Sequence, residues 1–115
     1  MTSASLGAGN VTITLDGDEV TLRPSLKAAQ TISKQAGGII AAIHAVGRFD
    51  FETIVSVVAL GLGVSQAKEV QSLAEKVYST GITDLVEPVT KYLTIIANGG
   101  RPVEVGGGEG EPDPR

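Results

Sequence analysis

The chain of 115 residues contains no cysteine, no tryptophan and one histidine. Without cysteine, the chain has no disulfide bonds, no thiolate catalysis and no cysteine-ligated zinc. Aromatic residues make up only 3% of the chain, so its 42% of hydrophobic residues are almost entirely aliphatic or alanine. The composition predicts one small, mainly helical domain. We expect it to carry neither a cofactor nor a metal.

Basic residues are outnumbered, nine Lys and Arg against 13 Asp and Glu, and the formal net charge is −4. An acidic surface repels phosphate, so we expect no nucleic-acid partner. The longest apolar runs, residues 36–46 and 53–64, are much shorter than the roughly 20 residues of a membrane-spanning helix. The first ten residues lack the basic start and apolar stretch of a signal peptide. We therefore expect a cytoplasmic protein without membrane contact.

Three segments differ in composition. Residues 1–10 are small and polar, which predicts a flexible N-terminal arm. Residues 11–99 carry every periodic apolar pattern, and we expect them to form a single folded domain. Residues 100–115 are rich in Gly, Glu, Pro and Asp and offer almost nothing to bury, so they are predicted to be a disordered tail.

Residues 11–22 have the pattern of a β-hairpin, because apolar and polar residues alternate on both sides of Asp16-Gly17. Asp-Gly favours a type I′ turn, in which both central residues have positive φ. A turn at Gly17-Asp18 would keep the same apolar face but would set Asp16 against Glu19. Such a hairpin is not stable alone and must pack on other elements. The favoured register pairs Val11 with Leu22 and Ile13 with Val20.

Five short helices are predicted between about residue 26 and residue 98. Pro24 ends the second strand because it has no N–H for the ladder, and Ser25 and Asp50 are good helix caps. The expected helix ends are Gly37, Gly47, Gly61 to Gly63, Gly81 and Gly99; a cap at Thr83 or Asp84 begins the last helix. The expected inward residues of the first, fourth and fifth helices are Leu26, Ala29, Ile32, Ala36; Ala67, Val70, Leu73, Ala74, Val77, Tyr78; and Leu85, Val86, Val89, Leu93, Ile96, Ala97. The predicted fold is thus α+β and mostly helical, with an N-terminal hairpin on a bundle of about five helices.

The second and third predicted helices, residues 39–46 and 51–60, contain more apolar residues than one buried face requires. This surplus predicts an apolar groove that binds helical segments of a protein partner. The alternative interpretation is that these residues fill the core or form the seam of a homodimer. The candidate partner-binding residues are Ile39, Ile40, Ile43, Ile54, Val58 and Leu62.

Candidates for chemistry are few. His44 lies in an apolar helix without a carboxylate nearby in sequence, which is typical of a structural or surface histidine. Asp16, Asp18 and Glu19 fit the solvated residues of a turn better than a metal site. Residues 61–68 resemble a phosphate-binding loop but lack its Gly-Lys-Ser/Thr ending. No nucleophile and base can be paired, so we expect a protein that is not an enzyme.

Residues 54–73 resemble a helix-turn-helix DNA reader. Ala59 and Gly63 have the expected spacing, but the position that should be apolar, six after the glycine, is Glu69. The would-be recognition helix carries as many acidic as basic residues, whereas a major-groove reader needs phosphate-contacting cations. A DNA-binding regulator is therefore kept only as an alternative.

The residues Val-Thr-Ile-Thr-Leu-Asp-Gly at 11–17 and Val-Thr-Leu-Arg-Pro-Ser-Leu at 20–26 resemble the opening of a family of phage and gene-transfer-agent tail proteins. The ending Tyr-Leu-Thr-Ile-Ile-Ala-Asn-Gly-Gly-Arg-Pro at 92–102 resembles the close of the same family. The family is classed with tail assembly chaperones and has also been labelled a gene-transfer-agent tail tube protein. The resemblance spans residues 11–102. Lys27 and Gln30 depart from it, because more acidic residues are expected there.

The resemblance implies that the chain binds the tape-measure protein in the cytoplasm before tail tube subunits polymerise around it. Tube subunits are a second implied partner, and a homo-oligomer is a further possibility. A structural role as a tail tube component is the alternative. The single predicted hairpin favours the chaperone, because a tube subunit needs a larger β-sheet to close a ring.

Overall fold

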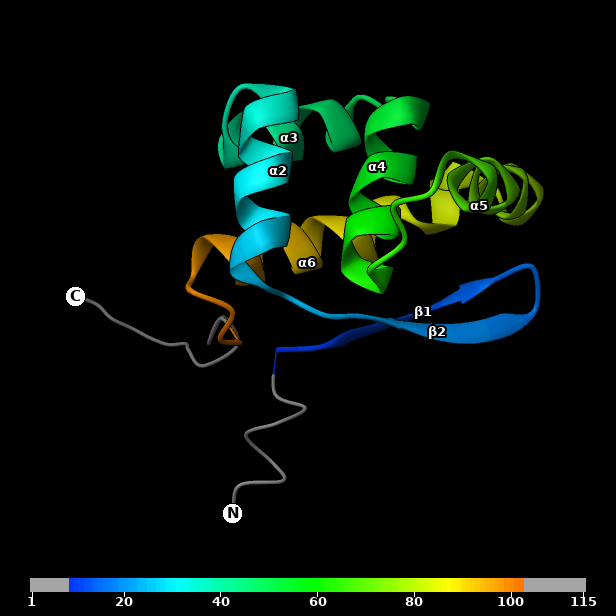
Figure 1. The fold of residues 1–115 in the computed structure, drawn as a ribbon, viewed down its shortest axis with the longest axis horizontal. Coiled ribbons are helices and arrows are strands. Elements are labelled where there is room, and N and C mark those ends of the chain that lie inside the picture. The colour runs from blue at the N-terminus through cyan, green and yellow to red at the C-terminus, as the bar shows by residue number, and fades with distance from the viewer. Residues whose placement is uncertain (1–8, 103–115) are drawn as a thin grey trace, which may run out of the picture.

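A two-stranded β-hairpin lies along one side of five helices in the computed structural model, which describes residues 9–102 (Figure 1). The chain is α+β and mostly helical, so the predicted fold class is confirmed. The expectations for residues 1–8 of the arm and 103–115 of the tail lie outside the described residues. The elements are β1 (Val11–Leu15), β2 (Asp18–Leu22), α2 (Leu26–Ala36), α3 (Ile39–Gly47), α4 (Phe51–Leu62), α5 (Ala67–Thr80), a 3₁₀ turn (Ile82–Asp84) and α6 (Val86–Ala97).

The hairpin has the predicted register, with Val11 opposite Leu22 and Ile13 opposite Val20. Asp16 and Gly17 have φ values of 52° and 89°, as a type I′ turn requires. Every second residue of β1 is buried against the helices, and the threonines between them are exposed. The tip is also fixed from outside the hairpin, because the Asp16 N–H donates a hydrogen bond of 2.7 Å to Thr80 Oγ1 at the end of α5.

Two of the predicted helix caps are confirmed. The Ser25 hydroxyl accepts a hydrogen bond of 3.0 Å from the Ala28 N–H, and Asp50 Oδ1 accepts one of 3.3 Å from the Thr53 N–H. The cap predicted at Thr83 or Asp84 is wrong. A 3₁₀ turn occupies this stretch, and α6 begins after Leu85, whose buried side chain fixes the chain there without any side-chain cap.

Three helices end in the same hydrogen-bonded loop, the Schellman motif. In α4 the Val64 N–H donates to the Ala59 carbonyl and the Gly63 N–H to the Leu60 carbonyl, and α6 ends in the same way around Gly99. In α3 the left-handed position is occupied by Phe49, with φ of 64°. The helix ends at Gly47 as predicted, but this glycine belongs to its last turn, and the left-handed residue comes two positions later.

Gly61 was expected to help end α4, but it lies inside the helix and is buried. A Cβ atom at this position would lie 2.9 Å from Leu22 Cβ, so only glycine allows the helix to approach β2 this closely. The Arg23 N–H donates a 2.8 Å hydrogen bond to the Gly61 carbonyl. Gly61 therefore allows α4 to pack directly against β2 of the hairpin.

Tyr92 is the largest fully buried side chain and is absent from the predicted inward set. Its hydroxyl donates a 2.7 Å hydrogen bond to the carbonyl of Arg23, at the end of β2. Burial raises the pKa of the Tyr92 hydroxyl to about 12. One aromatic residue thus connects the last helix to the junction between the hairpin and α2.

Four residues expected to face inward are exposed instead: Leu26, Ala67, Tyr78 and Ala97. Leu26 is 73% exposed because α2 buries the opposite side, through Ala28 and Ile32. Tyr78 is 79% exposed because the buried stripe of α5 is narrow and contains only Leu73 and Val77. Helices α2 and α5 therefore cover the core with a smaller face than their apolar residues suggest.

Within residues 9–102, no single helix is long and apolar enough to cross a membrane. Helices α4 and α5 have sufficient length and apolar composition only when taken together, and they bend by 119° at the connection between them.

Candidate functional site

The six candidate groove residues separate into two groups. Ile54 and Val58 on α4 have no exposed surface, so they fill the core and do not line a groove in this conformation. Ile39, Ile43 and Leu62 are half-buried and pack on the core. Ile40 alone is largely exposed, at 62%. The structure therefore does not gather the six residues into one groove.

The outward face of α3 carries one large apolar side chain and no Asp, Glu, Lys or Arg. Ile40, His44 and Gly47 are exposed and follow each other at intervals of four and three residues, which places them on one side of the helix. Ile43 is half-buried beside them. His44, a candidate for chemistry in the sequence, lies on this face as a surface residue. A helix with an apolar outer face has a surface suited to a protein contact.

Phe49 lies two residues after the end of α3 and is 48% exposed. Its left-handed backbone, with φ of 64°, is costly for any residue with a Cβ, and the equivalent positions after α4 and α6 are glycines. Phe51, two residues later, packs against the core, whereas Phe49 is not part of it. Folding alone does not account for a large aromatic side chain at position 49, so it is a candidate contact residue that the sequence analysis did not single out.

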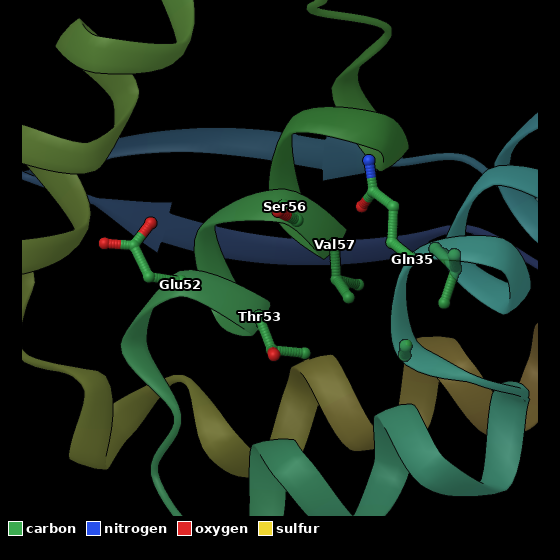
Figure 2. Close-up of a pocket in the computed structure, with 7 residues that line it drawn as sticks. Gln35, Glu52, Thr53, Ser56 and Val57 are labelled. Carbon is green, nitrogen blue, oxygen red and sulfur yellow. The ribbon is translucent and has the colours of Figure 1, made fainter.

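A hollow of about 260 Å³ lies between α2 and α4 (Figure 2). Its volume is below the roughly 300–1,000 Å³ of typical small-molecule sites. Figure 2 shows Thr53, Ser56 and Val57 along α4 with Gln35 across from them, while Glu52 projects away from α2. The hollow suits a single side chain of a partner better than a cofactor. It is lined by Ile32, Gln35, Ala36, Glu52, Thr53, Ser56 and Val57.

A second hollow, of about 410 Å³, lies between the hairpin and α5. Its apolar lining includes Leu62, one of the candidate groove residues, together with Leu15, Val20 and Leu73. Charged residues of both signs surround it, among them Lys68 and Glu69. Leu62 and Ile40 therefore belong to different surfaces.

The carboxylates of residues 9–102 do not assemble into a metal centre. Asp16, Asp18 and Glu19 are exposed at the hairpin turn. In the part of the chain that the structure describes, no group of three or more His, Asp or Glu side chains is placed to hold a metal ion.

The α4–α5 pair has the shape of a helix-turn-helix, because a four-residue connection joins two helices that bend by 119°. Its chemistry is less suitable. Lys68 and Lys76 on the exposed face of α5 are accompanied by Glu69 and Glu75, and Val70 is half-buried where Glu69 is exposed. The shape fits a DNA reader, but the side chains provide no excess of positive charge for phosphates.

Comparisons of the chain with protein families, with curated proteins and with solved structures find no match.

Proposed function

We propose that this protein is a phage-like or gene-transfer-agent tail assembly chaperone, which binds helical segments of the tape-measure protein before the tube forms. The observation that carries the proposal is the exposure of two large apolar side chains, Ile40 on the outward face of α3 at 62% and Phe49, two residues after the helix, at 48%. Neither side chain belongs to the core, whose apolar residues come from the hairpin and from all five helices. Their exposure is a cost unless a partner covers them.

The resemblance of residues 11–26 and 92–102 to tail assembly chaperones agrees with this surface. A chaperone of amphipathic helices needs an exposed apolar area, and it needs no catalytic group. Among residues 9–102 the sheet has two strands, which supports the chaperone more than the alternative of a structural tube subunit. Accordingly, we propose a binding protein and not an enzyme.

The test is an affinity capture of the full chain from cells that are assembling tails, with the bound proteins identified by mass spectrometry. Recovery of a very long, helix-rich protein is the expected result. The variant Ile40→Asp should lose this protein while it stays folded, since the side chain is exposed. Tyr78→Asp on α5 is the matched control, because Tyr78 is also a large exposed side chain, at 79%, and lies on a different helix. Recovery of tube subunits alone would support the structural role instead.

The helix-turn-helix shape of α4 and α5 favours a second candidate, a DNA-binding regulator. Such a protein should shift DNA in a gel at low salt and release it as salt is raised. We expect no shift, because Glu69 and Glu75 offset the two lysines of α5. A salt-dependent shift that is lost in Lys68→Glu/Lys76→Glu would replace the chaperone proposal with this one.

A further inference from the structure

The charges of this acidic protein are strongly segregated along the chain. Residues 20–49 hold none of the 13 Asp and Glu residues, yet they contain four of the nine Lys and Arg residues: Arg23, Lys27, Lys34 and Arg48. All four are exposed. This segment comprises β2 from Val20, all of α2 and α3, and Phe49. It is therefore a stretch of the chain without carboxylates in a protein whose net charge is −4, although Glu52 of α4 lines the hollow beside Gln35 of α2.

The outward side of α2 combines positive charge with an exposed apolar residue. Leu26, Lys27, Gln30 and Lys34 are all exposed, and at 100° per residue they lie within one arc, opposite the buried Ala28 and Ile32. Lys27 and Lys34 are seven residues apart, two helical turns, so both ammonium groups border Leu26 and Gln30 along the helix. Leu26 is 73% exposed. We call these four residues the α2 strip.

We infer that the α2 strip binds an amphipathic helix whose apolar stripe is bordered by Asp and Glu. The inference rests on the proposed function and names the chemistry of the helices that the chaperone captures. The occupant follows from charge complementarity. An acidic helix meets two lysines and no carboxylate of α2 itself, whereas on the exposed face of α5 it would meet Glu69 and Glu75 beside the lysines. The exposed Leu26 contacts the apolar stripe, and the lysines pair with its acidic border.

The dimensions agree with a short helical segment. The exposed part of the strip runs from Leu26 to Lys34, just over two turns of α2. An occupant helix of similar length presents two or three apolar residues to it.

The experiment measures the affinity of the full chain for two synthetic 18-residue amphipathic peptides by fluorescence anisotropy. The peptides share one leucine stripe and differ only in its border, glutamate in one and lysine in the other. We expect the glutamate peptide to bind at least tenfold more tightly, and we expect Lys27→Glu/Lys34→Glu to weaken it at least tenfold. Added salt should narrow the difference between the peptides, because exposed charges are screened.

The matched control is Lys68→Glu/Lys76→Glu on α5, which changes the net charge by the same amount on a different surface. It should leave the affinity within about twofold of the wild type, since a general charge effect on exposed sites is small. Equal losses of affinity for the glutamate peptide in both double variants would overturn the inference and show that only the net charge matters. Equal binding of the two peptides would overturn it as well.

Two other occupants of the α2 strip would give distinct results, one in light scattering and one in peptide binding by a further variant. If the wild-type chain self-associates in light scattering and Lys27→Glu/Lys34→Glu makes it monomeric, the strip binds a second copy and the inference fails. If the glutamate peptide binds only after Glu104, Glu109 and Glu111 are changed to glutamine, the occupant is the chain's own acidic C-terminal segment, and the inference again fails.

If the tape-measure protein is captured equally by wild type and the α2 double variant, the inference fails while the proposed function stands. If neither captures it, the proposed function itself fails.

Discussion

The two sides of the junction at Pro24 show how differently the same residue type is used in this protein. Leu22, at the end of β2, has no exposed surface and lies against Gly61 of α4. Leu26, four residues later in the first turn of α2, is 73% exposed. On the hairpin side, side chains are fixed by close packing and by the hydrogen bond from Tyr92. On the helical side, apolar and basic side chains are left open. The difference separates residues that hold the fold from residues available to a partner.

The largest expected effect comes from shortening the two leucines in turn. Leu22→Ala should lower the free energy of unfolding by about 2–5 kcal/mol, because it leaves a cavity between β2 and α4. Leu26→Ala should change it by no more than about 0.5 kcal/mol, as for other exposed positions. Urea titrations followed by circular dichroism measure both. A large loss in Leu26→Ala would show that this side chain is part of the core after all.

The next effect comes from glycine. Gly61→Ala should destabilise the protein by about 1–3 kcal/mol, because the new Cβ meets Leu22 and pushes α4 away from the hairpin. Gly47→Ala is the matched variant at an exposed glycine, in the last turn of α3. No atom lies within 4 Å of a Cβ built at Gly47, so the change should stabilise α3 by about 0.4–1 kcal/mol. The same denaturant titration should therefore show a lower free energy of unfolding for Gly61→Ala and a higher one for Gly47→Ala. Equal decreases for both variants would contradict this interpretation.

Tyr92→Phe tests the contact that closes the hairpin side. Without the hydroxyl, the Arg23 carbonyl loses its donor, and the protein should lose about 1 kcal/mol of stability. The pH dependence provides a second measurement. Burial raises the pKa of Tyr92 to about 12 from 10.0, so between these pH values the unfolded chain binds fewer protons than the folded one. The contribution is fully present below pH 10 and is lost as the pH rises towards 12, with a slope of at most about 1.4 kcal/mol per pH unit. Between pH 10 and pH 12, the melting temperature of Tyr92→Phe should fall less steeply with pH than that of the wild type. An equally steep fall in both proteins would show that other groups cause it.

The smallest effects concern the left-handed residues that end α3 and α4. Phe49→Gly should stabilise the protein by about 1 kcal/mol, because glycine relieves the strained backbone at the end of α3. Gly63→Ala, at the same position of the loop after α4, should destabilise it by a similar amount. If Phe49 is a contact residue, Phe49→Gly should also bind the tape-measure protein less tightly despite its greater stability. A stabilised variant with unchanged binding would remove Phe49 from the proposed contact surface.

Local rules explain what could be predicted from the sequence. The hairpin register follows from Asp16-Gly17 and alternation, and the starts of α2 and α4 follow from the side chains of Ser25 and Asp50. These features depend on residues close together in the chain. The Schellman end of α3 was missed, because the preference for glycine led the prediction to Gly47, whereas the left-handed residue is Phe49.

Long-range contacts explain the failures. The partner of Tyr92 is 69 residues away in the sequence, and nothing in the pattern of α6 indicates it. Gly61 resembles a helix end until the position of Leu22 is known. The candidate groove was only partly predictable for the same reason: apolar content identified α3 and α4, but only the packing shows that Ile54 and Val58 are covered while Ile40 is not.

The bond between Tyr92 and Arg23 also has a consequence for the order in which the chain matures on the ribosome. The hairpin is made first, yet two strands alone are only marginally stable. Its tip is held by Thr80 and its base by Tyr92, both near the end of the folded part. The two strands therefore cannot complete their packing until the last helix has been synthesised. Until that moment the apolar face of the hairpin lacks α6, one of the helices that cover it in the folded protein.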